Sequence, residues 1–173
     1  MMLCTLVLAL ALVPADAAVN PGLPVDWHGR WTGTLKITPV EGKEQETPME
    51  LTIEPIKDSK NFRWRIVYGE GKKQPVRDYE LIPQEKANHF VIDEKNGLLI
   101  DAWLVDRVLH SQFQVGDSLI PVRYERIGDL LRFSLTVSST KDPRESKLTG
   151  KDDFSVRAYK LQSFHVAELR KAK

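Results

Sequence analysis

Apolar and polar residues alternate along most of the chain between Trp27 and Phe164. Such alternation is typical of β-strands that bury one face, whereas a helical period does not persist for three turns anywhere. Short polar, glycine-containing or proline-containing segments interrupt the alternation and divide it into about ten runs. The pattern therefore predicts an all-β protein.

The stretch from Phe90 to Ser138 is the most informative, because its tight turns fix one register. Gly116-Asp117 and Gly128-Asp129 are read as two-residue turns, and Lys95-Asn96-Gly97 as a three-residue turn with Gly97 in a left-handed conformation. All the strands then present their apolar residues on one face, and a slip by one residue would destroy this agreement. The predicted pairs are Phe90 with Ala102, Ile92 with Ile100, Leu104 with Leu109, Ala102 with Ser111, Ile100 with Phe113, Val115 with Ser118, Phe113 with Ile120, Ser111 with Val122, Leu109 with Tyr124, Ile120 with Val137, Val122 with Leu135, Tyr124 with Phe133 and Arg126 with Leu131.

Consecutive tight hairpins favour a single up-and-down antiparallel β-barrel of about ten strands over a sandwich. In a barrel the last strand pairs with the first and removes both sheet edges. We expect a signal peptide at residues 1–17, an extended lead-in at 18–26, the barrel at 27–165 and a polar tail at 166–173. Residues 140–153 are charged and contain proline and glycine, so we expect a mobile loop there.

The N-terminus resembles an export signal. The apolar run Leu3 to Val13 ends at Pro14 and is followed by Ala15-Asp16-Ala17, a small-x-small cleavage pattern. The run is well short of the ~20 residues that span a bilayer, so no stable membrane span is expected. We therefore expect a secreted or periplasmic protein. If the true start lies upstream, Cys4 becomes a lipid-attachment site, and this alternative stays open.

Composition narrows the functional classes. The formal net charge is only +1 and is spread without blocks, so no nucleic-acid partner is expected. The only cysteine is Cys4, and the four histidines lack the spacing of metal ligands, so we expect neither metal nor cofactor. Motifs of hydrolases and phosphate loops are also absent. Asp93 and Asp101 near Trp103 offer only a weak glycosidase arrangement, so a non-enzymatic role is expected.

The segment Gly29-Arg30-Trp31 resembles the Gly-x-Trp signature that opens the first strand of lipocalins and related calycins. This resemblance implies that Trp31 is covered by an arginine from the last strand, Arg157, which would close the barrel. The Thr-Asp-Tyr motif and paired cysteines of lipocalins are missing, and ten strands suit fatty-acid-binding or nitrobindin-like relatives better. The Trp27 to Gly33 start and the Asp93 to Gly97 turn also resemble an uncharacterised group of exported bacterial proteins.

The inward faces of the strands suggest a site for a small apolar or amphipathic ligand. Ala102 and Ser111 form part of a belt of small residues that leaves room, while tyrosines and one arginine supply polar groups for a polar or anionic head. The candidate ligand-binding residues are Trp64, Tyr68, Tyr79, Phe90, Ala102, Ser111, Tyr124 and Arg126.

Two alternatives remain. Small residues opposite large ones also build a solid core, which would leave a structural or protein-interaction module. In that case the outward strip of Leu99, Asp101 and Trp103 would contact a protein partner, a second copy or the 140–153 loop. The nitrobindin-like resemblance adds a minor alternative, haem binding through a histidine such as His165, although the motif of those proteins does not align here.

Overall fold

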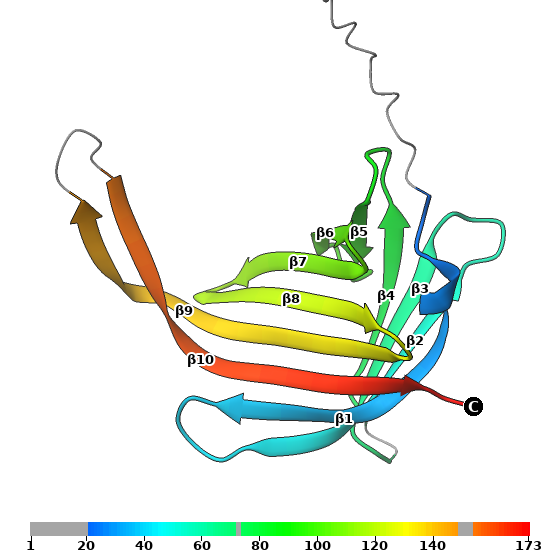
Figure 1. The fold of residues 1–173 in the computed structure, drawn as a ribbon, viewed down its shortest axis with the longest axis horizontal. Coiled ribbons are helices and arrows are strands. Elements are labelled where there is room, and N and C mark those ends of the chain that lie inside the picture. The colour runs from blue at the N-terminus through cyan, green and yellow to red at the C-terminus, as the bar shows by residue number, and fades with distance from the viewer. Residues whose placement is uncertain (1–20, 72–73, 149–153) are drawn as a thin grey trace, which may run out of the picture.

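Ten antiparallel strands follow one another around a closed barrel, and β10 pairs with β1 to complete it (Figure 1). The structure is a computed structural model that describes residues 21–71, 74–148 and 154–173. The predicted fold class is thereby confirmed. The strands are β1 (Gly29–Pro39), β2 (Gln45–Pro55), β3 (Phe62–Tyr68), β4 (Val76–Pro83), β5 (His89–Asp93), β6 (Leu99–Val105), β7 (Val108–Val115), β8 (Ser118–Ile127), β9 (Leu130–Leu148) and β10 (Phe154–Lys171).

The predicted register of the central meander is confirmed. Phe113 pairs with Ile120 and Val122 pairs with Leu135, and most of the other predicted pairs are also present. Within the described residues, Ile100 does not pair with Phe113 because the β6–β7 ladder ends at Ala102 and Ser111, and Ile120 does not pair with Val137 because the β8–β9 ladder is interrupted there. Gly116 and Gly128 open the two turns with φ of 54° and 56°, a left-handed conformation that favours glycine. Local turn chemistry therefore sets which side chains enter the barrel.

The seam between β1 and β10 closes the barrel. Its ladder runs from Trp31 opposite Lys171 to Pro39 opposite Ser163. At Gly33 the two strands approach so closely that a Cβ atom would collide with the carbonyl oxygen of Glu168. A residue without a side chain is therefore required on this stretch of the seam.

A short 3-10 helix, η1 (Val25–Trp27), lies at the end of the barrel where β1 begins. The side chain of Trp27 is fully buried, and Leu23 in the preceding segment is buried too. The backbone carbonyl of Trp27 accepts a hydrogen bond of 2.8 Å from the indole nitrogen of Trp31. The segment 18–26, expected to be an extended lead-in, thus supplies Leu23 to the closed end and forms the first two residues of η1.

The C-terminal part of the chain differs from the prediction. β9 continues to Leu148 and β10 begins at Phe154, so residues 140–148 form a strand rather than a mobile loop, while 149–153 lie outside the described residues. β10 also runs through the expected polar tail to Lys171. Pairing with β1 and β9 orders these residues, which their polar composition alone did not indicate.

We predict that Gly33→Ala lowers the free energy of unfolding by about 1–3 kcal/mol, because the added methyl group forces the β1–β10 seam apart. Chemical denaturation measures this change. Thr34→Ala, one position along the same strand, is the control and should change stability by about 0.5 kcal/mol or less. Equal stability of Gly33→Ala and the wild type would show that the seam does not need its close approach.

Candidate functional site

An apolar pocket of about 310 Å³ opens at the end of the barrel opposite η1. Strands β1, β2, β3, β9 and β10 supply most of its wall, and the strand pairings put these residues on the inward face. The volume lies at the lower end of the range of small-molecule sites, about 300–1,000 Å³. The pocket is lined by Leu35, Ile37, Thr47, Tyr68, Pro75, Phe133, Leu135 and His165.

Three tyrosines bring hydroxyl groups into the interior next to this pocket. Burial raises the pKa of Tyr68, which lines the pocket, and raises the pKa of Tyr79 to about 12, with the carboxylate of Glu94 adding to the latter shift. Burial also raises the pKa of Tyr124 well above its usual value, with Tyr68 contributing. All three remain neutral near pH 7 and offer donors and acceptors without charge.

Arg77 places a positive charge beside these tyrosines. It lies opposite Ile66 in the β3–β4 ladder, and because Ile66 is buried in the core, Arg77 lies on the inward face of the sheet near the open end. Its charge opposes the rise in the pKa of both Tyr68 and Tyr79. In the described part of the chain Arg77 forms no ion pair. Sequence reasoning missed it, although its position two residues before the inward Tyr79 was a usable signal.

His165 lines the pocket directly, as Tyr68 does. Burial lowers its pKa, so the imidazole is neutral at pH 7. The Ser163 hydroxyl lies 2.9 Å from its Nε2 atom. Within the described residues, no group of three or more histidine, cysteine or acidic side chains is arranged to hold a metal ion.

Most of the other predicted ligand residues lie deeper, in a packed core. The rings of Trp64 and Tyr124 meet edge to face with centroids 4.9 Å apart, and Phe133 lies 5.0 Å from Tyr124. Phe90 and Ala102 are fully buried. Ser111 pairs with Ala102 and is buried as well, so the belt of small residues is covered by neighbouring side chains and does not line the pocket.

Arg126 lies at the closed end of the barrel, not beside the tyrosines at the mouth. Its guanidinium stacks over Trp31 at 4.6 Å and donates hydrogen bonds to the carbonyl oxygens of Leu130 and Gly128. Asp26 lies 3.6 Å from the same guanidinium. These contacts use Arg126 in packing, and the expectation that it lies at the same end of the barrel as Tyr68 is wrong.

Arg157 does not cover Trp31. It lies on the exposed part of β10 and forms an ion pair of 2.9 Å with Glu145 on β9. Trp31 is buried, and the cations against its ring are Arg126 and Lys171. The arginine that closes the barrel therefore comes from β8, because β10 joins the barrel wall only from Ser163 onward, after residue 157.

The outward strip is only partly open. Leu99 is 67% exposed, but the imidazole of His89 stacks on Trp103 with centroids 4.2 Å apart. His89 Nε2 also lies 2.6 Å from a carboxylate oxygen of Asp101, and Lys86 approaches the Trp103 ring. Much of the strip therefore packs against its own neighbours.

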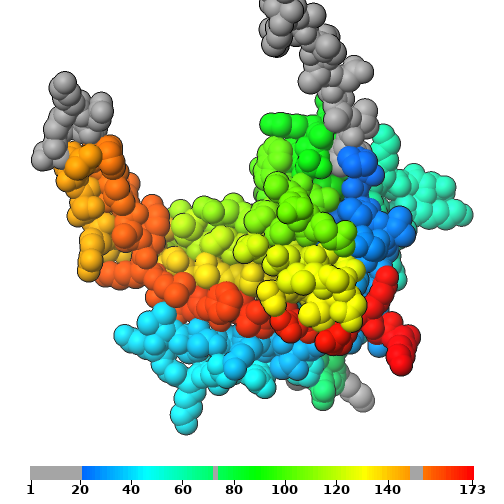
Figure 2. Space-filling view, in the orientation of Figure 1, coloured from blue at the N-terminus to red at the C-terminus, as the bar shows by residue number. Residues whose placement is uncertain are grey.

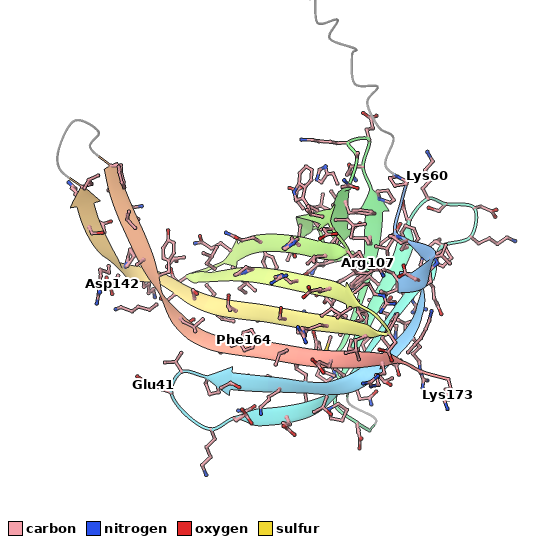
Figure 3. The ribbon with its side chains drawn as sticks, in the orientation of Figure 1. Glu41, Lys60, Arg107, Asp142, Phe164 and Lys173 are labelled. Atoms are coloured by element: carbon pink, nitrogen blue, oxygen red, sulfur yellow. The ribbon has the colours of Figure 1, made fainter. Side chains whose placement is uncertain are left out.

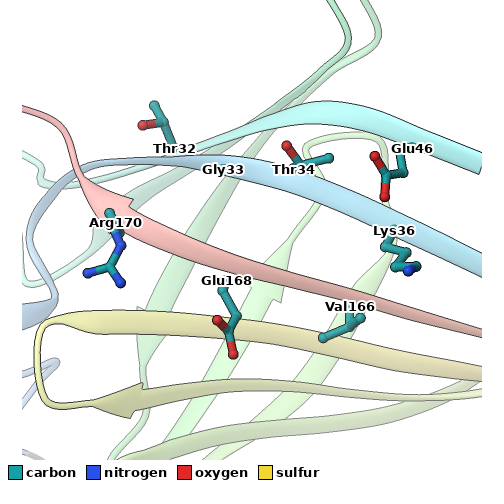
Figure 4. Close-up of a pocket in the computed structure, with 8 residues that line it drawn as sticks. All are labelled: Thr32, Gly33, Thr34, Lys36, Glu46, Val166, Glu168 and Arg170. Atoms are coloured by element: carbon teal, nitrogen blue, oxygen red, sulfur yellow. The ribbon is translucent and has the colours of Figure 1, made fainter.

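A second hollow lies on the outer surface where β1, β2 and β10 meet (Figure 4). It faces solvent along the seam at Gly33. Its principal charges already have partners, since Lys36 pairs with Glu44, Glu168 with Arg132, and Arg170 with Asp129. Glu46 is the one charged lining residue without an ion pair within the described residues, and the apolar pocket in the barrel mouth is the better site.

Comparison with known proteins identifies a solved structure with a similar fold, but no related family. No family model and no curated relative matches this chain. The structure is similar to the solved structure of the S-type phycobiliprotein lyase CPES from Guillardia theta, with a TM-score of 0.58 and 9% sequence identity, over 86% of this chain and 90% of that chain. The similarity concerns the fold, a closed antiparallel barrel. Among the described residues, no helix has the length and apolar character to cross a membrane.

We predict that Arg126→Met lowers the free energy of unfolding by about 2–4 kcal/mol, because it removes the cation over Trp31 and leaves two carbonyl groups without their donor. Arg157→Met should change stability by about 0.5 kcal/mol or less, since its ion pair is exposed. Thermal and chemical denaturation of the two variants measure the contrast. If Arg157→Met lowered the free energy of unfolding more than Arg126→Met, then Arg157 in the last strand would be the arginine that closes the barrel.

Proposed function

We propose that this protein is a non-enzymatic barrel that binds one small amphipathic molecule in the pocket at its open end. The observation that carries the proposal is the pocket itself, an apolar cavity of about 310 Å³ inside a closed barrel. The similar barrel of a phycobiliprotein lyase supports the proposal by analogy of fold.

The apolar body of the ligand would lie between Leu35, Phe133 and Leu135. Burial of about 300 Å² of apolar surface at about 25 cal/mol per Å² contributes about 7 kcal/mol, which corresponds to a dissociation constant of about 10 µM before the cost of ordering. No reactive group is needed for such binding. The head of the ligand would meet Arg77 and the hydroxyl of Tyr68, and a cation beside neutral donors favours an anionic head.

Export remains part of the proposal. It is supported by the apolar run and the small-x-small pattern at residues 3–17, which lie outside the described residues. Removal of the expected signal would take away Cys4, the only cysteine, so the exported protein would need a fold that is stable without disulfides. The closed barrel, whose described part contains no cysteine, meets this requirement.

We predict that filling the pocket abolishes binding. The probe is 1-anilinonaphthalene-8-sulfonate, a small molecule with an apolar body and an anionic head, whose fluorescence rises on burial. Leu135→Trp should weaken its affinity by about tenfold or more, because the indole occupies the cavity. Ser134→Trp, the adjacent outward position, is the control and should bind like the wild type. Equal affinities of the two variants would place the probe elsewhere, and native mass spectrometry of the purified protein would reveal any retained ligand.

A second prediction concerns the head group. Arg77→Gln should weaken binding of the anionic probe about five- to tenfold, because the exposed cation is lost. The same variant should bind N-phenyl-1-naphthylamine, which lacks the sulfonate, as tightly as the wild type. If Arg77→Gln bound both probes more weakly, the substitution would have damaged the pocket. If it bound both as tightly as the wild type, Arg77 would not be part of the site.

A further inference from the structure

The two strands that form the seam differ in length. As a result, one edge of β10 has no strand partner over part of its length. β1 pairs with β10 only between Ser163 and Lys171, although β10 begins at Phe154. Residues 154–161 therefore pair with β9 alone among the described strands. The upper parts of β9 and β10 form a two-stranded ribbon that projects clear of the barrel (Figures 1 and 2).

The ribbon begins at an irregular point in β9. Asp142 has a φ of 47°, and Figure 3 places it at the bend where the ribbon leaves the barrel. The ladder shifts its register between Ala158 and Lys160 of β10. Lys141 pairs with Asp117 on the β7–β8 turn, which fixes the base of the ribbon to the barrel. Above this base, residues 154–158 form a regular strand.

The two edges of the ribbon differ in how well they are protected against pairing. The β9 edge between residues 141 and 147 carries five charged side chains and Pro143, which are features that block the addition of another strand. The β10 edge between residues 154 and 161 is less protected: it contains no proline or glycine and two charged residues, Arg157 and Lys160. Its exposed apolar side chains are Phe154, Val156, Tyr159 and Leu161.

We propose that the β10 edges of two copies of this chain pair antiparallel about a two-fold axis at Val156 and join the two ribbons into one four-stranded sheet. Each strand supplies residues 154–158. An unprotected edge presents N–H and C=O groups that lack strand partners, and pairing with an identical edge satisfies them. A two-stranded ribbon alone is marginally stable in water, and pairing would bring Phe154, Val156 and Ala158 of the two copies together on one face.

The register follows from the side chains. With Val156 on the axis, Val156 faces its own copy, Phe154 faces Ala158, and Ser155 faces Arg157. No like charges meet. An axis at Arg157 would place two arginines opposite each other, and an axis at Ala158 would run into the register shift that follows it. The sequence of this edge is thus self-complementary in one register, which favours a second copy over an unrelated extended peptide.

The arrangement is also consistent across both faces of the ribbon. On one face, Phe154, Val156 and Ala158 of the two copies would meet at the centre of the sheet, with Leu148 beside Phe154 and the polar Ser146 and Arg144 on the outer strands. On the other face the existing Arg157–Glu145 ion pair is undisturbed. Gln162, at the barrel rim, lies six positions after Val156, which corresponds to about 20 Å of strand. This distance keeps the two barrels apart.

The test exploits the position of Val156 on the axis. Sedimentation velocity of the wild type should show a monomer–dimer equilibrium that shifts toward dimer between about 1 µM and about 500 µM, as expected for a small interface. Val156→Lys and Val156→Glu should each weaken dimerisation by tenfold or more, because like charges meet on the axis. An equimolar mixture of the two variants should recover a dimer at least as stable as that of the wild type. Val105→Lys, which places the same charge on an exposed valine near the closed end of the barrel, is the control and should not change dimerisation.

Three results would overturn the proposal. The first is a wild type that stays monomeric across the concentration range. The second is a Val156→Lys variant that dimerises like the wild type, which would place the contact on another surface such as the Leu99 and Trp103 strip. The third is a mixture of the lysine and glutamate variants that remains monomeric. Unchanged circular dichroism and melting temperatures of the variants would show that these exposed substitutions leave the fold intact.

Discussion

Pairing between β1 and β10 is the interaction on which the rest of the structure depends. It joins strands more than a hundred residues apart in sequence and removes the two free edges that the meander would otherwise leave. It also builds the pocket, because Leu35 and His165 come from opposite sides of this seam. Gly33 permits the close approach of the two backbones. Opening of the seam would therefore destroy barrel and pocket together.

The arginines at the two ends of the barrel, Arg126 and Arg77, lie in different environments. At the closed end, Arg126 is buried and its guanidinium meets Trp31, two carbonyl groups and Asp26. These contacts offset the cost of removing a charge from water. At the open end, Arg77 is exposed and unpaired within the described residues, so its charge stays available. Only the open end combines free polar groups with an apolar cavity, and this difference supports the assignment of the site.

The same strand supports both proposals by different means. The lower half of β10 is sealed between β1 and β9 and encloses the pocket. The upper half extends beyond β1 and leaves one edge uncovered. The ribbon begins beside the rim of the pocket, because Ser163 and His165 follow it directly along β10. Dimerisation through the ribbon would thus leave the mouth of each barrel open to a ligand.

Sequence alone determined the strand register of the meander and which residues face inward, because two-residue turns and alternation act between near neighbours. Tyr68 could be predicted as a site residue for this reason. The height of an inward residue along the barrel axis was not predictable, so Arg126 was assigned to the wrong end and Arg77 was missed. Strand lengths, the cover over Trp31 and the ribbon were decided by the tertiary structure, since they depend on contacts between strands far apart in sequence. Alternation specifies the face of a strand, but only closure of the barrel specifies its neighbours.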